Sequence, residues 1–265
     1  MPDVKASDAP FFRVIVPSCN VAGLIDRCVE SIARQTFQDF KIVIADDMST
    51  DGTRQRIQAL RQKYPDKILY EFLTEKQHGG GARNAAMKYF KNAAYTLFAD
   101  SDDYYLNKDS LKTIHDFIVE RKFPDLVKLS YIQTQGSKTV AGIINGNVIA
   151  DIVKINAPWT SCVKTSLCAQ FVPGRIRFND VVQSMRVYDS AKTLAVLQQP
   201  VYVYTIGDNK GSSQHAGLDM ERKAATYYLI ADLMNESYKN KDVEEQRKRL
   251  ILDKLEYLKE NDFFV

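Results

Sequence analysis

Three carboxylates lie within four residues, at Asp100, Asp102 and Asp103, directly after the apolar segment Tyr95 to Ala99. Two carboxylates separated by one residue at the exposed end of a buried strand can bind a common cation. Mg²⁺ and Mn²⁺ prefer oxygen ligands, and proteins commonly hold them with one or two carboxylates plus substrate phosphates. Capping of the next helix is the alternative, but it needs only one acid, and close acids repel each other. The spacing therefore indicates a divalent-cation site that would assist a diphosphate leaving group.

A second acidic pair, Asp46 and Asp47, follows the apolar segment Lys41 to Ala45. A carboxylate at a strand end can accept a hydrogen bond from a nucleobase N–H or from ribose hydroxyls. Side chains within 49–51 can cap the helix that follows. We therefore expect that Asp46 and Asp47 have no capping role and are available to a nucleotide.

A glycine-rich run, His78 to Asn84, is expected to open a helix. Glycine lets a ligand approach the backbone closely, and a helix N-terminus favours anions. Arg83 could bind a phosphate or pair with the acids around Asp100. An ordinary glycine-rich turn is the alternative interpretation.

The elements that must position these residues alternate between strand-like and helix-like patterns in the first half of the chain. Short apolar runs typical of buried strands are separated by segments whose apolar residues repeat with helical spacing. This alternation predicts an α/β fold with a mostly parallel central sheet flanked by helices, and ligands at the carboxyl ends of its strands. The expected strands are 12–16, 41–45, 68–73, 95–99 and 126–132, and the expected helices are 21–34, one carrying Ile57, Leu60 and Tyr64, 82–90 and one over 111–118.

The second half is richer in loops. Asn145-Gly146 predicts a hairpin, a helical pattern extends through Lys192, and 201–206 reads as a strand. Terminal helices are expected over 224–236 and 243–260. We expect one continuous domain with a flexible N-terminus (1–10), a nucleotide-sugar-binding half (11–132), an acceptor-binding and catalytic half (133–220) and C-terminal helices (221–265).

Composition narrows the possible partners. The 36 Lys and Arg residues exceed the 33 Asp and Glu residues by a formal net charge of only +3, which argues against nucleic acid. No apolar run is long enough to span a membrane, and the N-terminus has no secretory signal pattern. The four cysteines lack metal-ligand spacing, which favours a reduced, cytoplasmic protein. The basic, amphipathic last helix could contact the inner face of a membrane, pack on the protein or form a dimer contact.

Several of these segments together resemble the inverting glycosyltransferases of family 2, which have the GT-A fold. They occur in the family's order and at its spacing over the first half of the chain. The resemblance implies metal-dependent transfer of a sugar from a UDP-sugar to an acceptor hydroxyl with inversion, in cell-surface polysaccharide or glycoconjugate biosynthesis. The matching segments are 14–20, 35–37, 46–53, 81–84 and 98–103.

The resemblance also implies roles for individual residues in donor binding. Asp100-Ser101-Asp102 would be the family's DxD motif, with Asp102 the direct ligand of Mn²⁺ or Mg²⁺ and Asp100 near the ribose or a metal-bound water. Asp46 or Asp47 would contact the base, expected to be uracil. The remaining pocket residues would be Pro17, Cys19 and Asn20, with Cys19 where the family usually has an aromatic residue. His215 could be an additional metal ligand, and a solvated loop histidine is the alternative interpretation.

The catalytic base is expected in the second half. The family's acidic pair corresponds to Asn179-Asp180, so that Asp180 falls on the base and Asn179 replaces the usual Glu. A carboxylate placed to take the acceptor's proton contributes typically about 10²–10⁴-fold. Asp189 is a weaker candidate for this role. Trp159 could stack on an acceptor sugar or belong to the core.

Other classes of function fit parts of the pattern. The Asn179 replacement also fits a nucleotide-sugar-binding protein with impaired catalysis. A sugar nucleotidyltransferase would have a related fold, but it should carry a glycine-rich phosphate loop after the first strand, where this chain has Pro17 to Asn20. A segment around Lys210, Ser212 and Ser213 resembles the loop of family 2 glycosyltransferases that closes over the diphosphate.

Overall fold

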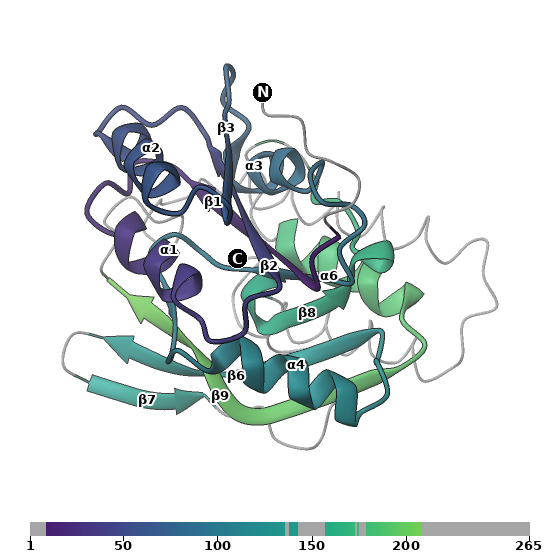
Figure 1. The fold of residues 1–265 in the computed structure, drawn as a ribbon. Coiled ribbons are helices and arrows are strands. Elements are labelled where there is room, and N and C mark those ends of the chain that lie inside the picture. The colour runs from purple at the N-terminus through teal and green to yellow at the C-terminus, as the bar shows by residue number, and fades with distance from the viewer. Residues whose placement is uncertain (1–8, 136–137, 143–156, 173, 175–178, 208–265) are drawn as a thin grey trace, which may run out of the picture.

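The structure is a computed structural model, and it describes residues 9–135, 138–142, 157–172, 174 and 179–207. These residues build one mixed sheet of nine strands in the order β3-β2-β1-β4-β8-β6-β9-β5, with β7 paired to β6 (Figure 1). The strands are β1 (Phe12–Ser18), β2 (Phe40–Asp46), β3 (Ile68–Phe72), β4 (Tyr95–Phe98), β5 (Tyr104–Tyr105), β6 (Leu126–Gln135), β7 (Lys138–Gly142), β8 (Ser161–Lys164) and β9 (Leu194–Ile206).

Helices cover both faces of this sheet. On one face, α1, α2 and α4 pack against alternate residues of the first strands, and on the other face α3 packs against the residues in between. Helix α6 continues this second layer over β6 and β8, where Val187 contacts Leu126 and Val163. The helices are α1 (Ile25–Ala33), α2 (Thr53–Lys63), α3 (His78–Ala86), α4 (Ser110–Glu120) and α6 (Asn179–Ser190), with short 3₁₀ turns at Pro158–Thr160 and Thr165–Leu167.

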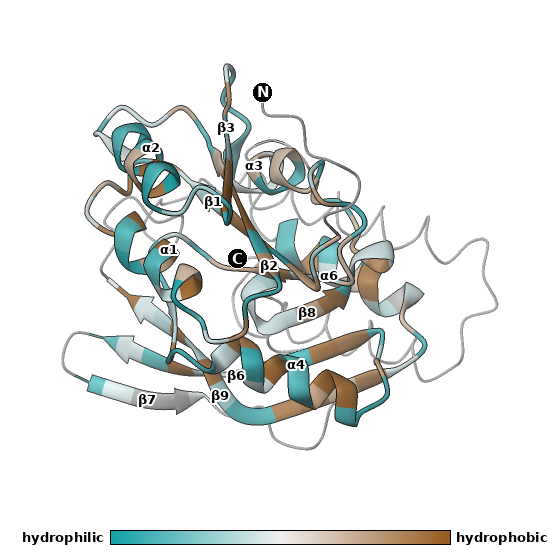
Figure 2. Ribbon diagram, in the orientation of Figure 1, coloured by the Kyte–Doolittle hydropathy of each residue, from teal (hydrophilic) through white to brown (hydrophobic). Residues whose placement is uncertain are grey.

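The core is formed by strands that are buried on both faces. Val14 and Ile42 belong to the cluster beneath α1 and α2, whereas Ile15 and Val43 belong to the cluster beneath α3. Such two-sided burial explains the continuous apolar runs in β1 and β2, because helices must cover both faces of a parallel sheet. Figure 2 shows brown segments in these strands and largely teal ribbons for α1 and α2.

The sheet changes character halfway along. The pairs β1–β2, β1–β4 and β2–β3 are parallel, as the alternating pattern predicts. Strand β8 then pairs antiparallel with both β4 and β6, and β7 forms an antiparallel hairpin with β6. The parallel β6–β9 pair shifts register around Ser130, opposite Pro200, which is where a residue without an N–H interrupts the ladder. The predicted α/β class is confirmed, and its antiparallel part was not predicted.

Most of the expected elements form close to their predicted bounds. Helix α3 begins at His78 rather than Ala82, so that the three glycines lie inside the helix. Strand β9 begins at Leu194, before the predicted Val201. The predicted hairpin at Asn145-Gly146 and both terminal helices lie outside the described residues. Within the described part of the chain, no helix is long and apolar enough to cross a membrane.

Candidate active site

The carboxyl ends of β1, β2 and β4 meet at one edge of the sheet, because these three strands are parallel. Strand β2 ends at Asp46, and the Asp100 to Asp103 turn follows β4. Asn20, Met48 and His78, which lie just beyond β1, beyond β2 and at the start of α3, have positive φ angles of 52°, 60° and 58°. Non-glycine residues rarely adopt this conformation, and such residues are concentrated at functional sites. The predicted nucleotide edge therefore contains locally strained backbone.

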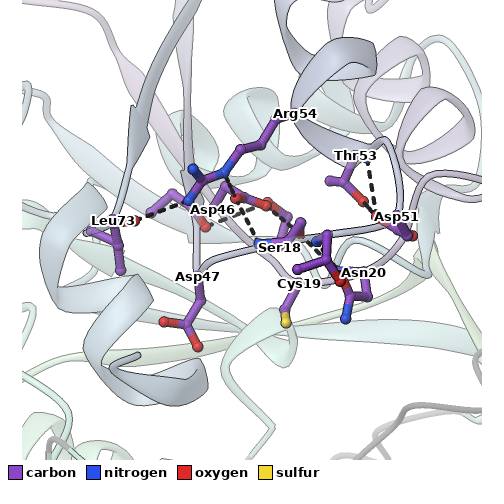
Figure 3. Close-up of polar contacts among 12 residues, drawn as sticks. Ser18, Cys19, Asn20, Asp46, Asp47, Asp51, Thr53, Arg54 and Leu73 are labelled. Atoms are coloured by element: carbon purple, nitrogen blue, oxygen red, sulfur yellow. Dashed lines mark hydrogen bonds and ion pairs between the residues drawn. The ribbon is translucent and has the colours of Figure 1, made fainter. Parts of the chain in front are cut away.

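Asp46 is fully buried, and its carboxylate is saturated by protein donors. Arg54 on α2 forms an ion pair with its Oδ1 through Nε at 2.6 Å, and the backbone N–H of Ser49 donates to the same oxygen at 3.1 Å. The hydroxyls of Ser49 and Ser18 bind Oδ2, the latter at 3.3 Å. Arg54 also donates to the carbonyl of Leu73 at 2.9 Å, so that Asp46 joins β1, β2, α2 and the end of β3 (Figure 3).

Asp47 has a different structural role, at the start of α3. Its carboxylate accepts the backbone N–H groups of Gln77 at 2.7 Å and His78 at 2.9 Å. Lys76 forms an ion pair with the same carboxylate at 3.2 Å. The expectation that Asp46 and Asp47 have no capping role is therefore wrong for Asp47, because the positive end of α3 binds this carboxylate. The expected anion at that helix N-terminus is supplied by the protein itself.

Cys19 lies on the same side of the loop as Asp47. Figure 3 shows the Cys19 thiol and the Asp47 carboxylate pointing to one side, away from Arg54. The ammonium group of Lys76 lies 2.8 Å from the Cys19 Sγ and donates to the Asp47 carbonyl at 2.8 Å. Burial lowers the pKa of Lys76, but the contacts with Cys19 and Asp47 outweigh it and raise the pKa. Sequence reasoning missed Lys76, because a lysine in a loop has no distinguishing pattern.

The loops after β1 and β2 are tied together by polar contacts. Asn20 accepts the Thr50 N–H through its side-chain oxygen at 2.8 Å and donates its own N–H to the Ser49 hydroxyl at 2.8 Å. Asp51 accepts the Ala22 N–H at 3.0 Å, and it also accepts the N–H and hydroxyl of a threonine in the first turn of α2. Pro17 lies at the end of β1, paired with Ala45 of β2. These residues therefore shape the predicted pocket together.

The Asp100 to Asp103 turn is anchored to β9. The Tyr202 hydroxyl accepts the Asp100 N–H at 3.0 Å and donates to the Asp103 carboxylate at 3.1 Å. Thr205 donates its N–H to Asp103 at 2.8 Å and its hydroxyl to the Asp102 carbonyl at 2.7 Å. A strand far along the sequence therefore sets the conformation of the turn. The segment 201–206 was expected to be a strand, but this anchoring role was not predicted.

Burial, together with the charges of Asp100 and Asp102, raises the pKa of Asp103 to about 8, although the Thr205 and Tyr202 donors oppose the rise. At neutral pH its carboxyl group is mainly protonated. Three acids within four residues are therefore accommodated by leaving one of them uncharged and turned inward. Asp100 and Asp102 remain as the carboxylates of the DxD-type turn, with the buried Ser101 between them.

Arg83 connects this turn to the second half of the chain. It forms an ion pair with Asp100, and the two side chains are 12% and 29% exposed. Of the two roles considered for Arg83, the structure shows the pairing with Asp100. Its guanidinium also lies over the ring of Phe171 at 5.4 Å, and its charge acts on Asp180. The side-chain Nε of Arg83 is buried without a hydrogen-bond partner.

Asp180 lies in the first turn of α6. Burial raises its pKa, while the charge of Arg83 and backbone N–H groups at the helix start oppose this rise. The charge of Asp100 also acts on Asp180, so the predicted base and the acidic turn lie within electrostatic reach of each other. Asn179 packs on Gly80 of α3. A carboxylate with a raised pKa near a cation is suited to taking a proton.

The oxygen donors of the acidic turn fit a divalent cation. Asp103 is turned inward, which leaves two carboxylates separated by one residue, and Mg²⁺ or Mn²⁺ commonly uses one or two carboxylates with substrate phosphates. In the described part of the chain, no group of three or more His, Cys, Asp or Glu side chains could hold a metal ion by itself. A cation here would therefore need oxygens from the donor as additional ligands.

The other predicted residues are distributed as follows. Trp159 is buried and stacks on Tyr202 and Tyr204, with ring centroids 5.0 and 5.1 Å apart, so the core alternative holds. Asp189 lies near the C-terminus of α6, far along the helix from Asp180. The predicted metal ligand His215 and the predicted loop around Lys210, Ser212 and Ser213 lie outside the described residues.

This fold and this edge define an α/β protein of the GT-A class. Residues 13–135 match the family model described as Glycosyl transferase family 2, so the first half of the chain is similar to that family. The structure is similar to the crystal structure of S. aureus TarS 1–349 in complex with UDP-GlcNAc, with a TM-score of 0.78 and 27% identity over 93% of this chain and 72% of that chain. A mannosyltransferase from Pyrobaculum calidifontis shares the fold, with a TM-score of 0.60 and 17% identity over 95% of this chain and 75% of that one.

Two relatives are similar over most of this chain. Poly(ribitol-phosphate) beta-N-acetylglucosaminyltransferase TarS of Staphylococcus aureus is 28% identical over 256 residues, covering 91% of this chain and 43% of that protein. Poly(ribitol-phosphate) beta-glucosyltransferase of Bacillus spizizenii is 28% identical over 247 residues, covering 89% of this chain and 38% of that protein. The chain thus spans less than half the length of these relatives.

Proposed function

We propose that this protein is an inverting glycosyltransferase that moves a sugar from a UDP-sugar to an acceptor hydroxyl. The observation that supports this most strongly is the position of Arg83, which pairs with Asp100 of the acidic turn while its charge acts on Asp180. A donor-binding turn and a candidate base therefore face one site. The match to the family model and the likeness to TarS in complex with UDP-GlcNAc support the same reaction.

In this proposal Asp180 is the general base. It takes the proton of the acceptor hydroxyl while that oxygen attacks the anomeric carbon, and the bond to the diphosphate breaks on the opposite side. A single displacement inverts the configuration and needs no covalent enzyme intermediate. Burial of Asp180 raises its pKa and so its basicity, and the charge of Arg83 opposes this rise.

The donor would lie along the edge formed by the ends of β1, β2 and β4. Pro17, Cys19 and Asn20 would line the uridine pocket with Asp47, and Asp46 would hold that pocket in shape. Asp102 and Asp100, which flank Ser101, would hold Mn²⁺ or Mg²⁺, which would neutralise charge on the diphosphate. Lys76, next to Cys19, would be an additional hydrogen-bond donor to the nucleobase.

The acceptor is proposed to be a hydroxyl of a cell-surface polymer or glycoconjugate. This rests on the relatives, two of which are named for poly(ribitol-phosphate). We place the proposed reaction in the cytoplasm, where the basic C-terminal segment could contact the inner face of the membrane.

Transfer assays with a panel of UDP-sugars and Mn²⁺ test this function. We expect turnover of at least one donor, and we expect Asp180→Asn to lower kcat by about 10²–10⁴-fold while UDP affinity is kept. Asp116→Asn, at an exposed position on α4, is the matched control. Full activity of Asp180→Asn would refute the base assignment. Metal-dependent UDP binding without turnover of any donor would favour a binding protein of the same fold.

A further inference from the structure

One face of α3 contacts the segment that precedes the candidate base. Gly80, Arg83 and Asn84 are spaced by three and four residues, so they lie on one side of the helix. Ala82, Ala85 and Ala86 are buried in the cluster beneath the sheet, so the two groups divide the helix into a sheet-facing side and a site-facing side. The site-facing side carries contacts that neither donor binding nor proton transfer requires.

Asn84 binds both backbone groups of a single residue. Its side-chain nitrogen donates to the carbonyl of Phe171 at 2.8 Å, and its side-chain oxygen accepts the N–H of the same residue at 2.8 Å. This two-bond pairing fixes both the position and the orientation of the peptide units around Phe171. No other type of side chain of this length offers a donor and an acceptor side by side in this way, because aspartate lacks the donor.

Gly80 allows the same segment to approach the helix one turn earlier. A Cβ at this position would stand 2.7 Å from the Val172 carbonyl oxygen and 2.7 Å from the Asn179 side-chain nitrogen. Both distances are far below normal contact, so a larger residue would displace the Val172 backbone and the Asn179 side chain. Gly80 therefore brings together the two ends of the connection from Phe171 to Asp180.

The helix itself is fixed at both ends. Asp47 binds the first N–H groups of α3, and the buried Arg13 donates to the carbonyls of Met87 at 2.8 Å and Tyr89 at 3.0 Å at the other end. A helix held in this way is a rigid reference against which another segment can be positioned. The same helix carries Arg83, which pairs with Asp100 of the donor-binding turn.

We propose that Gly80 and Asn84 are positioning residues for the general base: they hold the Phe171 segment and the start of α6 against α3, and so set the distance between Asp180 and the acidic turn. This inference rests on the proposed function. We call these contacts of Gly80 and Asn84 the clasp. The edge proposed to bind uridine is formed by other contacts. Loss of the clasp should therefore impair the chemical step and leave nucleotide binding intact.

Asn84→Ala tests the pairing with Phe171. We expect kcat to fall on the order of 100-fold, because an ångström-scale displacement of a reacting group has an effect of this size. The Kd of UDP with Mn²⁺ should stay within about threefold, as expected when only the chemical step is affected. Asn84→Gln, which keeps the amide on a longer side chain, should restore part of the rate. Asn92→Ala, at an exposed position, is the control and should change neither quantity.

Gly80→Ala separates positioning from a role in helix formation. Alanine favours a helix over glycine, so a purely helical role predicts an equally or more stable and fully active variant. The proposed role predicts instead a lower kcat with UDP affinity kept. Gly23→Ala is the matched control, because a Cβ there meets nothing within 4 Å.

Hydrogen exchange of the Phe171 amide tests the clasp independently of activity. We expect this amide to be protected in the parent protein and to exchange at least about tenfold faster in Asn84→Ala, because its acceptor is removed. If the parent transfers no sugar, this result still decides whether the clasp exists, so the two proposals fail separately. Unchanged kcat in both variants would overturn the positioning role, as would equal losses of kcat and UDP affinity.

Discussion

The two acidic turns of this protein follow β2 and β4, the parallel strands on either side of β1, yet they differ in how their charges are balanced. After β2, the carboxylate of Asp46 is paired with Arg54, and that of Asp47 with Lys76 and the start of α3. After β4, Arg83 pairs with Asp100, whereas Asp103 is held by the neutral groups of Tyr202 and Thr205. Burial and its acidic neighbours keep the pKa of Asp103 near 8.

This difference separates structural acids from acids with a proposed catalytic role. The first turn supplies its own cations and N–H donors, so its carboxylates hold the fold together without a ligand. The second turn concentrates negative charge and protonates one member to tolerate it, which is the arrangement expected where a cation is to bind. The role of two adjacent acids at a strand end therefore depends on their hydrogen-bond and ion-pair partners.

The largest expected effect concerns activity in the second turn. Asp102→Asn should lower kcat on the order of 10³-fold, because loss of a metal-binding carboxylate removes several kcal/mol of transition-state stabilisation. Stability should fall by less than in a substitution of the buried Asp46, since Arg27 and Thr205 bind the backbone carbonyl of Asp102, which the substitution retains. Kinetics at saturating Mn²⁺ and urea denaturation measure the two quantities. An Asp102→Asn variant that is unstable but active would contradict the proposed difference between the two turns.

The converse effect is expected in the first turn. Asp46→Asn should lower the free energy of unfolding by about 2–3 kcal/mol, below the usual cost of breaking a buried ion pair because Arg54 is 33% exposed. Urea denaturation measures this loss. Asp26→Asn, which breaks the exposed pair with Arg56, is the control and should cost less than about 0.5 kcal/mol. A loss no larger than that of the control would show that Asp46 is not a structural acid.

Asp125, remote from both turns, provides a reference for a satisfied carboxylate. Burial would raise its pKa, but hydrogen bonds from Lys164 and from the N–H groups of Lys192 and Thr193 lower the pKa to about 2. Its stabilisation is therefore present above the unfolded pKa near 3.8 and is lost as pH falls toward 2. The free energy of unfolding should decrease over this range by about 2 kcal/mol more in the parent than in Asp125→Asn. Parallel pH profiles of the two proteins would contradict this.

The smallest expected effect concerns the link between the second turn and β9. Tyr202→Phe removes the hydroxyl that joins Asp100 and Asp103, and it should cost about 1 kcal/mol of stability with the aromatic packing retained. Denaturant titration measures this cost, and a lower kcat should accompany it as the turn loosens. If the variant matches the parent in both measurements, β9 does not determine the conformation of the turn.

Much of the first half of the fold could be predicted from the sequence, because its signals are local. The apolar runs of β1 and β2 and the helical spacing in α1 and α4 follow directly from burial. The pairing of Arg83 with Asp100 was one of two roles considered for Arg83, although Arg83 lies in the last turn of α3 rather than at its start.

The second half could not be predicted in the same way. The pairing of β8 with both β4 and β6 depends on long-range contacts that leave no periodic pattern in four residues. The capping of α3 by Asp47 was missed because Ser49 to Asp51 offered closer caps for a different helix. The anchoring of the acidic turn by Tyr202 joins residues a hundred positions apart, and only the folded chain brings them together.

The carboxylate of Asp47 also has a consequence for how the site meets its substrate. Because this anion occupies the positive end of α3 from the moment of folding, the surrounding loops acquire their final form before any nucleotide arrives. The entropy of arranging them is lost during folding rather than during association. These loops should therefore bind a nucleotide with little rearrangement around Asp47.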